Sequence, residues 1–291
     1  MNKRKKVVVE HALTLFLEKG IQQTSIHDII ERASISKGTF YNYFSSKNEC
    51  LSAILDYISE EVSHSRTEIG IGKDMTQSEL LIDQISTVRQ LTEKHGLHAV
   101  IDEMLHSGDD ELKRLVLRYR FTEHEWISGR LVDLCGEELR PYAFEAAIIF
   151  FGILHHLLLT SKIINQHTTG IRQAATAAIQ YMPSIINGLI HGHTSILDPH
   201  KLAEWKHALQ IGNVGRDEVI ARLIDLAEEE RLTKAQSELA NALRDEFARD
   251  ALRTAVIHSL LPALYEEFKG SAQQQAALEV VNLAWSCVRQ R

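Results

Sequence analysis

The segment TSIHDIIERASISKGTFYNYF, residues 24–44, decides the fold of the N-terminal region. Ser25 stands three residues before Asp28, which is the spacing of a capping box, and the apolar residues that follow recur at helical spacing. Ser36 can cap a second short helix. Because only a tight turn separates the two helices, the segment predicts a helix-turn-helix, whose second helix enters the major groove of DNA.

The second helix of this pair has one apolar side and one polar side. Phe40 and Phe44 are four residues apart and can seal a core, which leaves the polar side chains outward. Lysine, asparagine and threonine can bond to base edges, tyrosine and lysine suit phosphates, glycine permits close approach, and amides at a helix start can hold a phosphate. The predicted DNA-contacting residues are Thr24 and Ser25 through their backbone, together with Lys37, Gly38, Thr39, Tyr41, Asn42, Tyr43 and Lys47. An ordinary solvated helix face is the alternative interpretation of the same residue types.

The surrounding sequence supports a basic DNA-binding end on an acidic protein. Apolar residues recur at helical spacing over residues 3–19 and Gly20 follows as a stop, while Ser46 and Glu49 predict a capping box that opens a long fourth helix. The whole chain has a net charge of −7, but residues 1–50 carry +3. This asymmetry is typical of a protein that meets a polyanion at one end.

Residues 8–51 resemble the DNA-binding domain of the tetracycline-repressor (TetR) family. The resemblance is carried by VVVEHALTLFLEKG and by TSIHDIIERASISKGTFYNYFSSKNECL, in which SKGTFYNYF and the lysine three residues after it are close to the recognition-helix motif of the family. It implies that Ser25 and His27 lie near phosphate. It also implies that residues 37–43 form the recognition surface and that Lys47 meets the DNA backbone.

Three residues depart from the family pattern. Ser34 stands where the family usually has the turn glycine, Ile30 where it usually has alanine, and His11 where it usually has a small residue. A left-handed turn built on a residue other than glycine costs about 1 kcal/mol. We therefore expect a turn that is slightly strained but keeps the DNA-facing residues in place.

The sequence pattern predicts helices through the rest of the chain, so the predicted fold is all-α. Helices are predicted at residues 47–66, 77–95, 97–106, 110–134, 141–165 and 171–191. The predicted domains are a helix-turn-helix domain at 1–50, a helical effector-binding and dimerisation domain at 51–193, and a helical extension at 194–291. The apolar helices 141–165 and 171–191 stand where the resemblance implies a four-helix dimer interface, and burial within one chain is the alternative.

A small-molecule effector is implied by the resemblance. Candidate pocket residues combine bulk with a few polar groups, although such residues more often belong to a protein core. The candidates are Tyr119, Phe121, Trp126, Phe151 and His155.

Other chemistry has little support. His95, His98 and Asp102 could share a helix face only if Gly96 does not break the helix, so we expect no metal site and no cofactor. Phosphate-binding glycine loops and hydrolase or protease motifs are missing from the sequence, which argues against an enzyme. The chain shows no secretion signal, its apolar run at 143–159 suggests a buried helix, and we expect a cytoplasmic protein that does not bind membranes.

Amphipathic stripes continue through the C-terminal extension. They involve residues such as Leu223, Leu243, Leu264 and Val281, and they require a surface on which to be buried. The extension either packs on the preceding domain within the dimer, which we favour, or forms a separate domain for a partner. The leading hypothesis is a homodimeric repressor that leaves a palindromic operator when an effector binds. The alternative is a DNA-associated helical scaffold whose extension recruits a protein.

Overall fold

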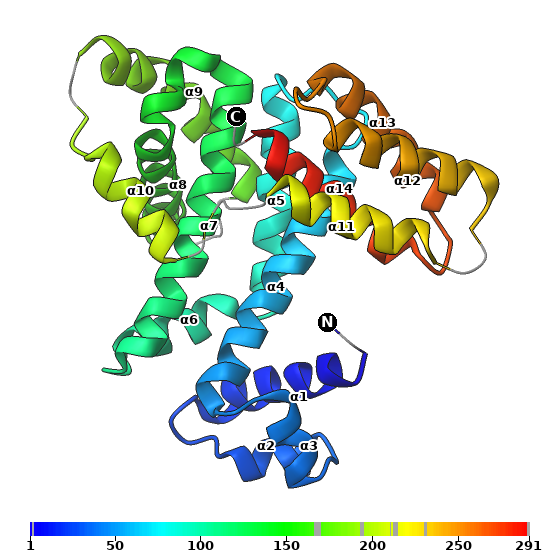
Figure 1. Cartoon of the computed structure of the whole chain (residues 1–291). Coiled ribbons are helices and arrows are strands. Elements are labelled where there is room, and N and C mark those ends of the chain that lie inside the picture. The colour runs from blue at the N-terminus through cyan, green and yellow to red at the C-terminus, as the bar shows by residue number, and fades with distance from the viewer. Residues whose placement is uncertain are drawn as a thin grey trace.

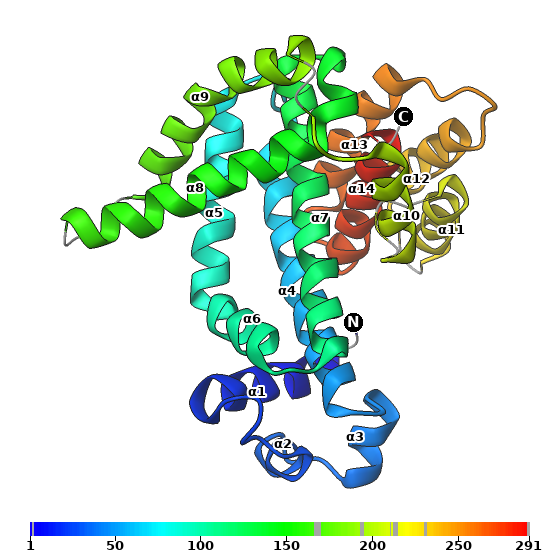
Figure 2. The same cartoon turned by 90° about the vertical axis from the view of Figure 1, so that its left-hand side faces the viewer.

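The computed structural model describes residues 1, 3–165, 170–192, 195–209, 211, 215–229 and 232–289. Within these ranges all regular structure is helical, which confirms the all-α prediction (Figures 1 and 2). The helices are α1 (Lys3–Lys19), α2 (Ile26–Arg32), α3 (Lys37–Tyr43), α4 (Lys47–Gly70), α5 (Ser78–Lys94), α6 (Leu97–His106), α7 (Asp110–Cys135), the 3₁₀ helix η1 (Glu137–Tyr142), α8 (Ala143–Asn165), α9 (Ile171–His191), α10 (Pro199–Ala208), α11 (Arg216–Ala227), α12 (Lys234–Phe247), α13 (Thr254–Phe268) and α14 (Gln274–Arg289).

The first hydrophobic core lies under the head, which we define as α1–α3. Phe16, Ile29 and Phe40 are buried there against the first half of α4. The same core continues into α6 and the start of α7, through residues such as Met104 and Val116. The head is therefore attached to the rest of the protein by α6 as well as by α4, which rises from it over 24 residues (Figure 2).

The second core is formed by α5, α7, α8 and α9, which we call the body. Small residues on α8 and α9, among them Ala147 and Ala178, are fully buried where the two helices meet. The far end of α8 extends past this contact, and Ile163 and Ile164 are about 70% and 71% exposed. Among the described residues, one helical segment, Glu137–Ser161, is long and apolar enough to cross a membrane, judged by length and composition alone. The core helix of a soluble protein passes the same test, and 39% of the most apolar window of this segment is buried within the protein.

The third core belongs to α11–α14, which we call the C-terminal bundle. The predicted stripes are confirmed, because Leu223, Leu243, Leu264 and Val281 are all completely buried in it. The bundle lies on the side of α4 that faces away from α8 and α9 (Figures 1 and 2).

Polar contacts join this bundle to α4. The hydroxyl of Tyr265 donates to Glu68 at 3.0 Å, Thr67 bonds to Asn282, and Gln275 lies 3.0 Å from the ring nitrogen of His64. The extension thus has a core of its own and also docks on the helix that leads to the head. The domain boundaries stated above stay predictions.

Candidate DNA-binding surface

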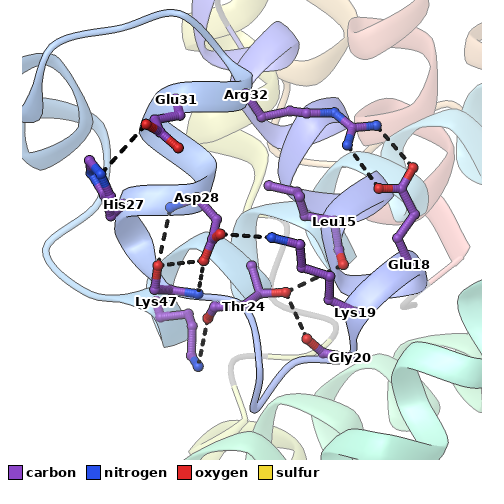
Figure 3. A network of polar contacts seen from close by, with 11 residues as sticks. Leu15, Glu18, Lys19, Gly20, Thr24, His27, Asp28, Glu31, Arg32 and Lys47 are labelled. Carbon is purple, nitrogen blue, oxygen red and sulfur yellow. Dashed lines mark hydrogen bonds and ion pairs between the residues drawn. The ribbon is translucent and has the colours of Figure 1, made fainter.

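Helix α2 is fixed by the capping box that the sequence predicts. The backbone N–H of Asp28 donates to the Ser25 hydroxyl at 3.1 Å, and the N–H of Ser25 donates to the Asp28 carboxylate at 2.8 Å. Lys19 on α1 donates to the same carboxylate at 2.8 Å (Figure 3). These bonds, led by the one from Lys19, hold the pKa of Asp28 well below its usual range.

A second ion pair joins α1 to α2. Arg32 donates two hydrogen bonds to Glu18, at 2.8 and 2.9 Å, in the bidentate geometry that gives the strongest pairs (Figure 3). Because one pair lies at each end of α2, this helix cannot easily rotate on α1.

Helix α3 is oriented by its cap and by two phenylalanines. The Ser36 hydroxyl accepts from the N–H of Thr39 at 3.1 Å, as expected for an N-cap. Phe40 and Phe44 are buried with ring centroids 5.3 Å apart. Since these rings point into the core, the opposite side of α3 faces outward.

The outward side of α3 carries most of the predicted base-reading and phosphate-binding groups. Lys37, Gly38, Tyr41 and Asn42 are exposed, and the Lys37 ammonium lies 6.0 Å from the Tyr41 ring. Thr39 and Tyr43 are half-buried at the edges of this face. We call these six residues of α3 the recognition face.

The turn between α2 and α3 adopts the left-handed conformation that the departure at Ser34 implies. Ser34 has φ of 52°, the only positive φ outside glycine in the described residues. Backbone bonds from Ser34 to Glu31 and from Ile35 to Ile30, both 3.1 Å, hold it there. The turn therefore keeps its shape with a side chain that this conformation disfavours.

Two predicted residues have side chains bonded within the protein. Thr24 is buried, and its hydroxyl donates to the carbonyl groups of Gly20 at 2.7 Å and Leu15 at 3.3 Å. The Lys47 ammonium donates to the carbonyl group of Ile21 at 2.8 Å and to that of Thr24 at 3.2 Å, the second of which is drawn in Figure 3. Thr24 can thus reach DNA only through its backbone, as predicted, and Lys47 has one donor left.

His27 and the start of α4 complete the predicted set. His27 is exposed at the outer side of α2, 3.7 Å from Glu31. The capping box expected at α4 is half correct: Ser46 accepts from the N–H of Glu49, but the Glu49 carboxylate accepts from the backbone and hydroxyl of Ser45, both at 2.6 Å. Ser45 lies one residue nearer α3, so this bond also ties the end of α3 to α4.

Residues far away in the sequence also hold the head. Glu103 on α6 accepts hydrogen bonds from the backbone N–H of Ile21 at 2.6 Å and of Gln22 at 3.2 Å. Asn48 donates to Asp109 at 3.1 Å and to Glu111 at 2.6 Å. Sequence reasoning missed these contacts because no local pattern marks partners that are 61 to 82 positions apart.

The predicted effector residues do not converge on one cavity. Tyr119 packs on the first core, and Trp126 lies against the Arg66 guanidinium at 3.7 Å. The ring of Phe121 lies tilted against Phe144, Phe151 contacts His124 edge-on, and His155 is exposed. Their role in effector binding stays a prediction.

Two cavities lie in or beside the body. One, of about 120 Å³, lies between η1, the start of α8 and α10, and includes Phe144, Glu145 and Lys206. The other, of about 500 Å³, is an open groove along the far half of α8 that includes Ile153, Leu157 and Ile164. Neither includes a predicted effector residue.

The histidines considered for a metal have other partners. Gly96 has φ of 60° and separates α5 from α6, so His95 and His98 do not share a helix. His95 bonds to Glu61 at 2.6 Å, and His98 lies 2.7 Å from Arg89.

Comparison with known proteins agrees with this geometry. The sequence profile of the family described as "Bacterial regulatory proteins, tetR family" matches residues 8–54, which span most of the head and the start of α4. Residues 8–54 therefore form a TetR-family DNA-binding domain. The chain is accordingly a transcriptional regulator with a helix-turn-helix DNA-binding domain, and the relatives that follow are themselves named transcriptional regulators.

Three relatives extend the similarity beyond the TetR-family domain. It is 24% identical to the uncharacterized HTH-type transcriptional regulator YuxN of Bacillus subtilis (strain 168) over 65% of each chain. It is 22% identical to the regulator YerO of the same organism over 91% of this chain and 90% of YerO, so that match runs into the C-terminal bundle. The HTH-type transcriptional repressor KstR2 of Rhodococcus jostii (strain RHA1) is 28% identical over 41% of this chain and 55% of its own length.

Proposed function

We propose that the protein is a homodimeric, cytoplasmic repressor that binds a palindromic operator and leaves it when a small molecule binds the body. The single observation that carries this proposal is the recognition face. Lys37, Tyr41 and Asn42 project outward from a seven-residue helix whose other side is locked into the core. A short helix so fixed and so polar suits entry into the major groove.

Each residue of this face has a role in the proposal. Asn42 reads an adenine edge, Lys37 a guanine edge or phosphate, and Thr39 a base edge. Tyr41 and Tyr43 contact phosphates. A Cβ at Gly38 would meet only the Ser36 hydroxyl, at 3.8 Å, so no contact inside the protein requires glycine there. Close approach of DNA to the backbone explains it better.

A second copy of the chain covers the exposed apolar side of α8 and α9. Ile148, Leu159, Ile163 and Ile164 of α8 and Tyr181 of α9 are all exposed. Neighbouring exposed apolar residues of this size usually mark an interface. A two-fold dimer presents two recognition helices to half-sites about 34 Å apart or a multiple of that spacing.

Repression and release complete the proposal. The relative KstR2 is named a repressor, which supports this sign of regulation. An effector that binds better to a dimer with wrongly spaced heads would release the operator in proportion to its differential affinity. The five predicted effector residues remain our candidates, and one of them, Phe121, contacts the ring of Phe144 with centroids 5.3 Å apart.

The scaffold alternative has lost its main support. It requires an exposed apolar patch on the extension, whereas the amphipathic faces of α11–α14 are largely buried in the C-terminal bundle. We therefore do not favour a partner-recruiting role for the bundle.

Selection from a randomised DNA library tests the proposal. The full-length protein should enrich one palindromic sequence, and sedimentation should show a dimer that binds it as a single unit. The Ile163→Glu variant should weaken the dimer, with Ile224→Glu on the C-terminal bundle as its control. Failure to enrich any sequence would contradict the proposal.

A further inference from the structure

The turn between α1 and α2 is held from two opposite directions. On one side, the Glu103 carboxylate of α6 accepts from the backbone N–H groups of Ile21 and Gln22, both through the same oxygen, Oε1. On the other side, the Lys47 ammonium of α4 donates to the carbonyl groups of Ile21 and Thr24. A single turn thus lies between a fixed anion and a fixed cation.

One peptide group touches both charges. The peptide that joins Ile21 to Gln22 receives the Lys47 ammonium on its carbonyl oxygen at 2.8 Å and offers its N–H to Glu103 at 3.2 Å. Hydrogen bonds in such a chain polarise and strengthen one another. Lys47 and Glu103 therefore act on one peptide group, from opposite sides.

The Glu103 carboxylate packs closely against the backbone of the turn. Gly20 has φ of 84°, and a Cβ there would lie 3.1 Å from the Glu103 carboxylate. Ile21 is only 2% exposed, so its N–H requires an acceptor inside the protein. Met104, next to Glu103, is fully buried in the first core and fixes α6 beside the turn.

We propose that Glu103, which lies outside the DNA-binding domain, is a positioning residue for DNA binding. It sets the turn that leads into α2, and through the Ile21–Gln22 peptide it holds Lys47 with one ammonium donor directed to a DNA phosphate. The inference rests on the proposed function. The ligand is a phosphodiester at the edge of each half-site, and Glu103 itself does not touch it.

The test compares Glu103 with its neighbour Asp102. Asp102 is an exposed carboxylate on the same helix, so Asp102→Ala and Asp102→Asn repeat each charge change without touching the turn. The probe is the duplex that the full-length wild-type protein selects from a randomised library. Affinity is measured by fluorescence anisotropy between low and physiological salt, and thermal unfolding verifies that each variant is folded.

Glu103→Ala should bind this duplex about tenfold more weakly than Asp102→Ala, as expected for the loss of a charge-assisted hydrogen bond. The slope of log K against log salt should fall by about 1 for each subunit whose Lys47 loses its phosphate. The DNA affinity of Glu103→Gln should stay close to that of Asp102→Asn, because the glutamine amide oxygen can accept both hydrogen bonds that Oε1 of Glu103 accepts.

A double-mutant cycle distinguishes positioning from general stability. In a Lys47→Met background, Glu103→Ala should cost little further affinity, because both residues act through one peptide. Full additivity, or equal binding by Glu103→Ala and Asp102→Ala, would overturn the inference while the proposed function stands. If the wild type selects no duplex, the proposed function itself fails.

Discussion

The head and the C-terminal bundle are both small helical units with a buried phenylalanine at the centre, Phe40 in one and Phe247 in the other. Their outward faces differ. On α3, a lysine, a tyrosine and an asparagine are exposed without an ion pair in the described part of the chain. On the bundle, surface charges pair among themselves, as Lys234 with Glu238 and Lys269 with Glu266.

This difference separates a surface that binds from a surface that is solvated. Charges that already have partners in the same unit gain little from a ligand, since exposed pairs are nearly neutral in energy. Cationic and amide groups without partners gain much more from a polyanion. The outward faces, and not the buried cores, therefore indicate where each region acts.

The largest expected effects come from creating a cavity in the core of the head or in the core of the C-terminal bundle, one at a time. Phe40→Ala should destabilise the head by about 3–5 kcal/mol and abolish operator binding, because α3 loses the side chain that orients it. Chemical denaturation and anisotropy measure the two effects.

Phe247→Ala is the matched change in the C-terminal bundle. It should cost the bundle a similar free energy and leave DNA affinity within about threefold, since its cavity lies in another core. Loss of operator binding in this variant would show that the two regions are not independent.

A smaller effect should distinguish residues of the recognition face that contact bases from those that contact phosphates. Asn42→Ala should cost about 1–3 kcal/mol at one base position, while Tyr41→Ala should weaken binding to all sequences alike. Binding to a panel of single-base operator variants measures this. An equal loss on every variant after the Asn42 change would refute its assignment as a base reader.

A change at Ser34, in the turn between α2 and α3, should alter the free energy of unfolding by about 1 kcal/mol. Ser34→Gly should stabilise the protein by that amount, because glycine adopts the left-handed conformation without steric cost. Ser34→Ala is the control, since it removes the hydroxyl and keeps the strain, and it should leave the midpoint of urea unfolding almost unchanged. A gain with alanine equal to that with glycine would exclude backbone strain as the cause.

The smallest expected effect is the part of the loss of stability at low pH that is due to Asp28. Its pKa is lower in the folded protein than in the unfolded chain, so its contribution is present above about pH 4 and is lost as the pH falls toward the folded value. Urea unfolding at pH 7 and pH 3 should therefore show a smaller difference for Asp28→Asn than for the wild type. An unchanged difference would mean that Asp28 is not part of the acid response.

The head could be predicted almost residue by residue because its determinants are local. The Ser25–Asp28 box, the Ser36 cap and the pair Phe40 and Phe44 each span three or four positions. Such patterns are visible in one sequence because their geometry follows from the helix alone.

Contacts across long separations could not be predicted in the same way. Glu103 reaches a turn 82 positions earlier, and Tyr265 bonds to Glu68 across 197 positions. The helices of the C-terminal bundle were evident from their stripes, but their docking on α4 depends on such contacts. The effector residues failed to converge for the same reason: bulky residues at helical spacing indicate burial and do not specify which cavity they share.

Sequence-selective DNA binding is tested most directly by fluorescence anisotropy of the full-length protein with the duplex it selects and with a scrambled duplex, across salt concentrations. We expect tight binding to the selected duplex, with log K falling linearly in log salt, and far weaker binding to the scrambled duplex. Equally weak binding of both duplexes at every salt concentration would contradict the central claim that the recognition face reads DNA sequence.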